Sequence, residues 1–152
     1  DCDDTHHPSQ IPAMLAALDD GHDLVIASRY RRGARVAGVA PHPRLLSLAA
    51  ALLFKALHPC RGVLDYTCGY RAYRMALLQR AQARYGENLV RERGFACMVE
   101  VLLKLDRLGA RFHEIPLELR YDLKQRASNM EVGGNTVRLL RKLVSWRFRG
   151  LE

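Results

Sequence analysis

Acidic side chains open the sequence, with Asp1, Asp3 and Asp4 within its first four positions. Two aspartates one residue apart can hold a hard divalent cation, because such ions take oxygen ligands and can bridge to a diphosphate. Mg²⁺ or Mn²⁺ would suit this arrangement. The alternative is an acidic surface end without a ligand, since short acidic clusters are common on protein surfaces. The residue types alone leave both interpretations open.

Arginines gather after the apolar stretch Leu24–Ala27. Guanidinium groups bind phosphate oxygens through charge-assisted and often two-pronged hydrogen bonds. Arg29 is the strongest candidate because it directly follows the apolar stretch, and ligands bind at strand ends in open α/β sheets. For any single arginine the alternative is a solvated basic loop. The arginines concerned are Arg29, Arg31, Arg32, Arg35 and Arg44.

The segment Asp65–Tyr73 is dense in small and polar residues. Gly69 would permit an unusual backbone angle or a close approach to a ligand. Asp65 could serve as a general base and Arg71 as a phosphate contact. The other interpretation is a strand edge with Asp65 in a turn, and the two are equally supported by the residues.

Several helices and strands must position these side chains. Apolar periodicity and glycine stops predict helices over 8–19, 44–58, 75–85, 94–108 and 135–148. Strands are expected within 23–28, 66–73 and 110–121, and loops over 29–43 and 122–134. Alternating helices and strands indicate an α/β or α+β domain.

The length of 152 residues suits one domain, and the apolar fraction of 49% is enough for a core. The formal charge of +8 favours anionic partners, namely phosphates, an anionic membrane surface or nucleic acid. The four cysteines form no CxxC pair, which argues against a zinc site or a disulfide framework. The longest apolar run, Leu45–Phe54, is half of the roughly 20 residues that a membrane span needs.

The last helix is amphipathic and basic. It can lie in a membrane interface, or it can pack on the core with a solvated basic face. We therefore divide the chain into residues 1–134, which hold the candidate site, and 135–152, a basic C-terminal helix. The apolar residues expected on one side of this helix are Val137, Leu140, Leu143, Val144 and Phe148.

Six segments, in order, resemble family 2 glycosyltransferases, and most of all dolichol- or polyprenyl-phosphate mannose synthases. Any one of these segments is a weak signal, but the ordered set covers nearly the whole chain. They are Asp1–Pro8 (DxD-x-x-H-x-P), Ala27–Tyr30 (G-S-R-Y), Thr67–Tyr73 (T-S-G-F-R-A-Y), Gly94–Glu100 (G-F-x-x-x-x-E), Glu114–Pro116 (E-V-P) and Ser128–Met130 (S-K-M).

The resemblance implies a GT-A-type α/β fold, a central mixed sheet flanked by helices, without the N-terminal nucleotide-binding strands. It implies an inverting transfer of a sugar from a nucleotide-sugar donor to an isoprenoid lipid phosphate at the cytoplasmic face of a membrane. Mg²⁺ or Mn²⁺ would steady the departing diphosphate. On this view the chain begins partway through a catalytic domain, and alone it should be inactive.

The resemblance also implies roles for individual residues. Asp1, Asp3 and Thr5 would lie at the metal. The donor or acceptor phosphate would be bound by Arg29, Arg44 and Ser47. Asp65 and Arg71 would be catalytic, with Thr67, Gly69 and Glu100 on the acceptor and sugar side.

Two other functions compete with this one. A nucleic-acid-binding module would account for the charge, but the chain has no recognised binding motif and few aromatic residues among its basic ones. We therefore expect no nucleic-acid partner. A non-catalytic membrane-surface domain built on helices 44–58 and 135–148 is compatible with a lipid-phosphate acceptor.

Overall fold

The structure is a computed structural model that describes residues 6–37, 41–120 and 132–151. Its elements run in the order η1 (Pro8–Gln10), α1 (Ile11–Asp19), β1 (Leu24–Ser28), β2 (Arg35–Ala37), α2 (Pro41–Leu57), β3 (Arg71–Tyr73), α3 (Met75–Tyr85), η2 (Gly86–Leu89), α4 (Phe95–Arg107), β4 (Phe112–Pro116), β5 (Glu118–Arg120) and α5 (Val132–Arg149).

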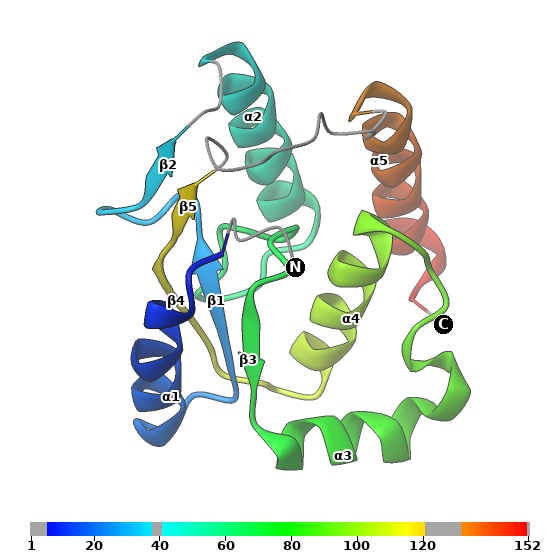
Figure 1. Ribbon diagram of the computed structural model, residues 1–152. Helices are drawn as coiled ribbons and strands as arrows, with labels where there is room; N and C mark the ends of the chain where they lie inside the picture. The colour runs from blue at the N-terminus through cyan, green and yellow to red at the C-terminus, as the bar shows by residue number, and fades with distance from the viewer. Residues whose placement is uncertain (1–5, 38–40, 121–131, 152) are drawn as a thin grey trace.

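Three strands form a mixed sheet in the order β3–β1–β4 (Figure 1). The central strand β1 runs parallel to β4 and antiparallel to β3. Strands β2 and β5 form a separate parallel pair. Helices flank the mixed sheet, which confirms the predicted α/β class and the arrangement expected of a partial GT-A fold.

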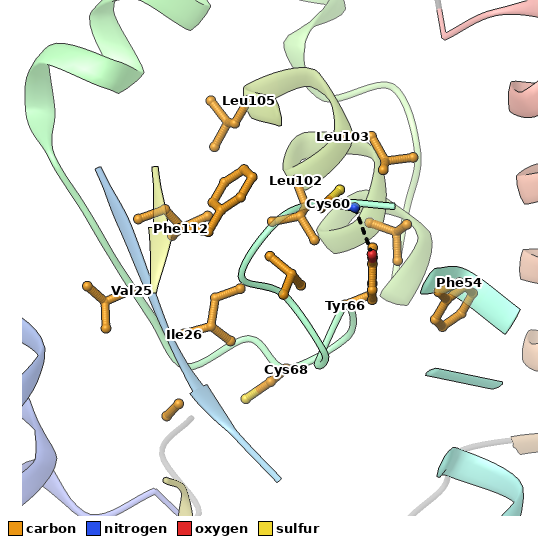
Figure 2. Packing of buried hydrophobic residues seen from close by; sticks show 14 of the residues in the cluster. Val25, Ile26, Phe54, Cys60, Tyr66, Cys68, Leu102, Leu103, Leu105 and Phe112 are labelled. Carbon is orange, nitrogen blue, oxygen red and sulfur yellow. Dashed lines mark hydrogen bonds between the residues drawn. The ribbon is translucent and has the colours of Figure 1, made fainter. Parts of the chain in front are cut away.

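All five residues of β1 are buried, as its uninterrupted apolar run predicts for a strand covered on both faces. Helix α1 packs against all three strands of the sheet. Figure 2 shows Ile26 and Phe112, from β1 and β4, in the same buried cluster as Leu102 and Leu105 of α4. Residues 24–28 are therefore held in place from both sides, and the strand end at Ser28 is a rigid support for the residues after it.

Tyr66 anchors the connection between α2 and β3. Its side chain is buried, and its hydroxyl accepts from the backbone N–H of Cys60 at 3.1 Å (Figure 2). The same hydroxyl donates to the carbonyl of His58 at 2.7 Å. Hydrogen bonds to both a donor and an acceptor offset the cost of burying this hydroxyl. The segment that leads to Asp65 is thus part of the core.

Several predicted boundaries need correction. The predicted loop 29–43 contains the short strand β2 and the first turn of α2. In the predicted strand 66–73 only β3 is extended sheet, because the backbone before it turns around Asp65. The predicted strand 110–121 divides at Leu117, whose N–H donates to Ser28 in the main sheet while its carbonyl accepts from Arg35 of β2.

Helix α5 begins at Val132, inside the predicted loop 122–134, of which residues 122–131 lie outside the description. It packs on α2 and α4 through a side centred on Leu139 and Leu143. Val144 and Phe148, expected on the same side as Leu143, are instead exposed, Phe148 to 81%. The buried side is therefore rotated relative to the apolar side predicted from the sequence.

Candidate functional site

Arg29 directly follows β1 and is held by a buried aspartate. Its Nε and Nη2 atoms donate to Oδ2 and Oδ1 of Asp65 at 2.8 and 2.7 Å, and its backbone N–H donates to Oδ2 at 3.0 Å. Such two-pronged pairing fixes both the position and the plane of a guanidinium group. The Asp65 carboxylate is fully buried, whereas 28% of the Arg29 side chain is exposed. Arg29 is therefore the member of the pair that a ligand could reach.

The same aspartate organises the turn after it. Oδ1 of Asp65 accepts from the backbone N–H groups of Cys68, at 3.0 Å, and Thr67, at 3.4 Å. The Thr67 hydroxyl in turn accepts from Nη2 of Arg29 at 2.6 Å. The structure thus brings together three predicted site residues, Arg29, Asp65 and Thr67.

Protonation follows from this pairing. Burial alone would raise the pKa of the Asp65 carboxyl, but the hydrogen bonds and charge of Arg29 outweigh it and hold that pKa below its usual value. Burial would likewise lower the pKa of the Arg29 guanidinium, and the hydrogen bond and charge of Asp65 raise it instead. The pair is therefore ionised at neutral pH, with the positive charge at the more accessible end.

Ser47 reaches this group through Tyr30. The Tyr30 hydroxyl lies 2.7 Å from Oγ of Ser47 and donates to the Ser47 carbonyl at 3.0 Å. The guanidinium of Arg29 lies over the Tyr30 ring, 5.4 Å from its centroid. Helix α2 is thereby tied to the end of β1. The Tyr30 side chain lies between Ser47 and Arg29, and the phosphate contact predicted for Ser47 stays a prediction.

Arg71 lies on the neighbouring strand β3 and binds backbone carbonyls. Its guanidinium donates to Cys68 at 2.8 Å, to Tyr66 at 2.8 Å and to Met98 at 2.9 Å. These bonds join the turn after Asp65 to α4. They give Arg71 a positioning role, and its predicted catalytic role stays a prediction.

Glu100 belongs to a different set of contacts. Its Oε2 accepts from the backbone N–H groups of Arg91 and Glu92, both at 2.9 Å, and its Oε1 accepts from Lys104 at 2.7 Å. These bonds hold the segment before α4 against the helix. The structure groups Glu100 with that segment rather than with Arg29 and Asp65.

Gly69 does not have the unusual backbone angle that the sequence suggested. It is exposed, its φ is outside the left-handed region, and an added Cβ would meet only the terminal methyl of Met98 at 3.6 Å. Several described glycines have positive φ, and Gly62 combines that angle, φ of +82°, with a Cβ position only 2.8 Å from the Phe112 carbonyl oxygen. Sequence reasoning missed Gly62 because Cys60–Asp65 reads only as a connection.

Glu114 of β4 is a buried carboxylate that the site prediction also missed. Its Oε1 accepts from the backbone N–H groups of Leu64 and Asp65, both at 2.7 Å, and its Oε2 lies 3.4 Å from Nε of Arg31. Burial raises the pKa of the Glu114 carboxyl, although these backbone hydrogen bonds oppose the rise. Its burial could have been predicted from the sequence, because side chains alternate between the two faces of a strand and Glu114 lies on the same buried face as Phe112.

The predicted metal ligands Asp1, Asp3 and Thr5, and the side chain of Arg44, lie outside the described residues. Within the part of the chain that is described, no cluster of three His, Cys, Asp or Glu side chains could hold a metal ion. The description starts at His6, whose ring meets that of Tyr70 edge to face at 5.2 Å. The Tyr70 hydroxyl donates to the His7 carbonyl at 3.0 Å.

Several proteins of known name are similar in sequence to this chain. The chain is 27% identical over 150 residues to polyprenol monophosphomannose synthase of Mycolicibacterium smegmatis, covering 99% of this chain and 54% of the relative. It is 29% identical to undecaprenyl-phosphate mannosyltransferase of Micrococcus luteus, with coverage of 100% and 61%. The chain is a homologue of family 2 glycosyltransferases.

A third family 2 homologue is the dolichol-phosphate mannosyltransferase of Pyrococcus furiosus, 30% identical over 105 residues, which are 68% of this chain and 28% of the relative. No protein-family model matches the chain. The chain spans about half to three-fifths of the length of the first two relatives. The resemblance seen in the six ordered motifs is thus confirmed over the whole chain.

Proposed function

We propose that this chain forms part of a catalytic domain that transfers a sugar from a nucleotide-sugar donor to an isoprenoid lipid phosphate. The observation that carries the proposal is Arg29, fixed at the end of β1 by buried Asp65 while part of its side chain stays accessible. The names of the homologues describe mannosyl transfer to polyprenyl or dolichyl phosphates, which supports the same reaction class.

The chemistry of such an acceptor fits an arginine better than a base. A lipid phosphate is already an anionic nucleophile at neutral pH, so it needs orientation and charge neutralisation rather than deprotonation. Asp65 already accepts hydrogen bonds from Arg29, Thr67 and Cys68 on its two oxygens. We assign Asp65 and Arg71 to positioning Arg29 and the adjoining turn, with Thr67 and Gly69 next to the acceptor and sugar.

The other predicted roles are kept as proposals. Arg44 and Ser47 would bind phosphate beside Arg29. Glu100, predicted on the acceptor and sugar side, would contribute there only by holding the segment before α4, without a contact to the phosphate. Asp1 and Asp3, with Thr5, would hold Mg²⁺ or Mn²⁺, which when bound neutralises a diphosphate leaving group. His6 and His7, the first residues that the structure describes, contact Tyr70, which lies at the end of the turn that follows Asp65.

Contact with a membrane surface is the next part of the proposal. The outward residues of the described part of α2 are all apolar, and the one charged residue among 47–57, Lys55, turns inward to donate to the carbonyls of Cys60 and Val63. Such a face suits the apolar boundary of a bilayer, and the charge of +8 suits the anionic cytoplasmic leaflet. Its exposed members are Leu48, Ala49, Leu52, Leu53 and Ala56.

Among the described helices, none has the length and apolar character needed to span a bilayer. Flotation with vesicles tests surface contact directly. We expect the chain to float with vesicles that contain anionic lipid, and Leu52→Ser to lower the bound fraction severalfold because it removes an apolar side chain that is 59% exposed. Equal flotation of both proteins would contradict this part of the proposal.

A transfer assay tests the reaction. The complete gene product is incubated with a panel of nucleotide sugars and a polyprenyl monophosphate, and the glycolipid is quantified. We expect Arg29→Ala to lower transfer at least a hundredfold, since it removes charge-assisted hydrogen bonds to phosphate. Arg32→Ala, an exposed arginine three residues away, is the matched control and should retain transfer.

The same assay separates the finer proposals. Chelation with EDTA and restoration by Mg²⁺ or Mn²⁺ tests the metal, and the anomeric configuration of the product tests inversion. The 152-residue chain by itself should give no transfer. Full transfer by Arg29→Ala would contradict the central role of Arg29.

A further inference from the structure

A second arginine–carboxylate pair lies beside the first one. We propose that Arg31, positioned by Glu114, is a further arginine that contacts the phosphate group bound by Arg29. This inference rests on the proposed function, because it assigns a further residue to the same phosphate site. Neither the motifs nor the names of the homologues single out Arg31.

The two pairs share one stretch of backbone. The carboxylate of Asp65 holds Arg29, while the backbone N–H of Asp65 donates to Oε1 of Glu114 at 2.7 Å. The neighbouring N–H of Leu64 donates to the same oxygen, also at 2.7 Å. One carboxylate oxygen of Glu114 is therefore committed to the connection before Asp65, and the other is left for a cation.

Arg31 supplies that cation. Its Nε lies 3.4 Å from Oε2 of Glu114, and within the described structure neither atom has a hydrogen-bond partner although both are buried. A buried carboxylate without a nearby positive charge is strongly disfavoured, so Glu114 holds Arg31 in place electrostatically. Only Nε of Arg31 faces Glu114, which leaves the two terminal nitrogens of the guanidinium as donors for a ligand.

Arg31 is accessible, and it is close enough to Arg29 to contact the same phosphate. The Arg31 side chain is 40% exposed, more than the 28% of Arg29. The Cα atoms of the two residues can be at most about 7 Å apart, because the residues are two positions apart along the chain. The turn is closed locally by hydrogen bonds from Tyr30 N–H to the Ser28 hydroxyl and from Ala34 N–H to the Arg31 carbonyl. A phosphate monoester has three terminal oxygens, enough to bind both guanidinium groups.

Arg32 provides the natural comparison. It is one residue further along, carries the same charge and is exposed. If only the net charge of the loop mattered, Arg31 and Arg32 would be interchangeable. The position fixed by Glu114 makes the two arginines unequal, and this inequality can be measured.

Calorimetric titration of the 152-residue chain with farnesyl monophosphate tests the proposal. Farnesol controls for the isoprenoid tail, and inorganic phosphate separates a free-phosphate site from a lipid-phosphate site. We expect Arg31→Ala to weaken binding of farnesyl monophosphate about tenfold, as loss of a charge-assisted contact predicts. Arg32→Ala should change the dissociation constant less than twofold.

Glu114→Gln tests the positioning step, because it removes the charge but keeps an oxygen for the Leu64 and Asp65 N–H groups. We expect it to weaken binding severalfold in the unmodified chain and to add nothing in the Arg31→Ala background. Thermal melts show whether Glu114→Gln is folded. If it is not, Glu114→Asp takes its place in the same test. Equal losses in both backgrounds would contradict positioning through Arg31.

The outcomes separate this inference from the proposed function. If Arg29→Lys weakens binding but Arg31→Ala does not, the inference on Arg31 is wrong and the phosphate site at Arg29 stands. If binding is retained by both variants, the phosphate site itself is wrong. Absence of binding by the unmodified chain overturns both.

Discussion

Two pairs of a buried carboxylate and a cation in this molecule have similar contacts, but their cations differ in exposure. Asp65 pairs with Arg29 at the end of β1, and Glu100 pairs with Lys104 inside α4. Both carboxylates also accept backbone N–H groups of a neighbouring segment. The Lys104 side chain has no exposed surface, whereas that of Arg29 is 28% exposed.

The difference shows how to separate a structural ion pair from a ligand site. The burial of the acid is the same in both cases, so it carries no information about function. The two pairs are distinguished by whether the cation can still reach a ligand. By this criterion Arg29 is a candidate for anion binding, and Lys104 is a structural residue that holds η2 and α4 together through Asn88 and Glu100.

The largest effect is expected at the fully buried pair. Lys104→Met leaves the Glu100 charge buried without its partner and should lower the free energy of unfolding by about 3–5 kcal/mol. Urea titration measures this loss. The double variant Lys104→Met, Glu100→Gln should recover much of it, and binding of farnesyl monophosphate by folded protein should not change. A weaker affinity would mean that the two pairs are not functionally separate.

Gly62 and Gly69 separate two kinds of position: Gly62 lies in the backbone that supports the site, and Gly69 lies on the exposed surface beside it. Gly62→Ala forces a left-handed residue to carry a Cβ within 2.8 Å of the Phe112 carbonyl, so we expect a loss of about 2–4 kcal/mol. Gly69→Ala is the matched control, since its Cβ would make only ordinary contact with Met98. Urea unfolding should show a change below about 0.5 kcal/mol for Gly69→Ala.

Arg29→Lys tests the accessible pair without removing its charge. Lysine is a point charge and cannot reproduce the two-pronged bond to Asp65, so the cation loses its fixed position. We expect calorimetry to show about tenfold weaker binding of farnesyl monophosphate, equivalent to about 1.4 kcal/mol. The stability loss should be smaller than that of Lys104→Met. The reverse order would contradict the contrast between the buried and the accessible pair.

The smallest effect is expected in the pH dependence of stability, to which Asp65 and Glu114 contribute with opposite signs. The lowered pKa of Asp65 contributes stability above its unfolded value of about 3.9, and this stability is lost as the pH falls through the folded pKa. The raised pKa of Glu114 has the opposite sign, since folding becomes more favourable as the pH falls through that pKa toward about 4.3. Urea unfolding between about pH 3 and 7 should therefore show a flatter acid limb for Asp65→Asn and a steeper one for Glu114→Gln.

The elements with long periodic patterns could be predicted from the sequence. Helix α3 has the predicted bounds, and α4 differs from its prediction by one residue at each end. Their apolar spacing and the glycines that end them are local signals. Strand β2 could not be predicted, because three residues carry too little pattern. The division of the predicted strand 110–121 into β4 and β5 was also missed, because it depends on Leu117 linking two sheets.

The candidate site was only partly predictable for a related reason. Arg29 could be found because it directly follows an apolar run, and Thr67 because it lies in a polar segment. That Asp65 is a partner of Arg29 rather than an available base follows from a contact between residues 36 positions apart. The pairing of Glu114 with Leu64 and Asp65 spans about 50 positions, and nothing local to those segments indicates it.

Tyr30 has a mechanical consequence for the molecule. Its hydroxyl meets both the side chain and the carbonyl of Ser47, so α2 cannot rotate about its axis or slide along it without breaking these bonds. The tilt of this helix and the direction of the neighbouring guanidinium are therefore set jointly. A membrane surface that shifts the exposed leucines of α2 would therefore also shift the Arg29 guanidinium, because the Tyr30 ring connects the helix to that group.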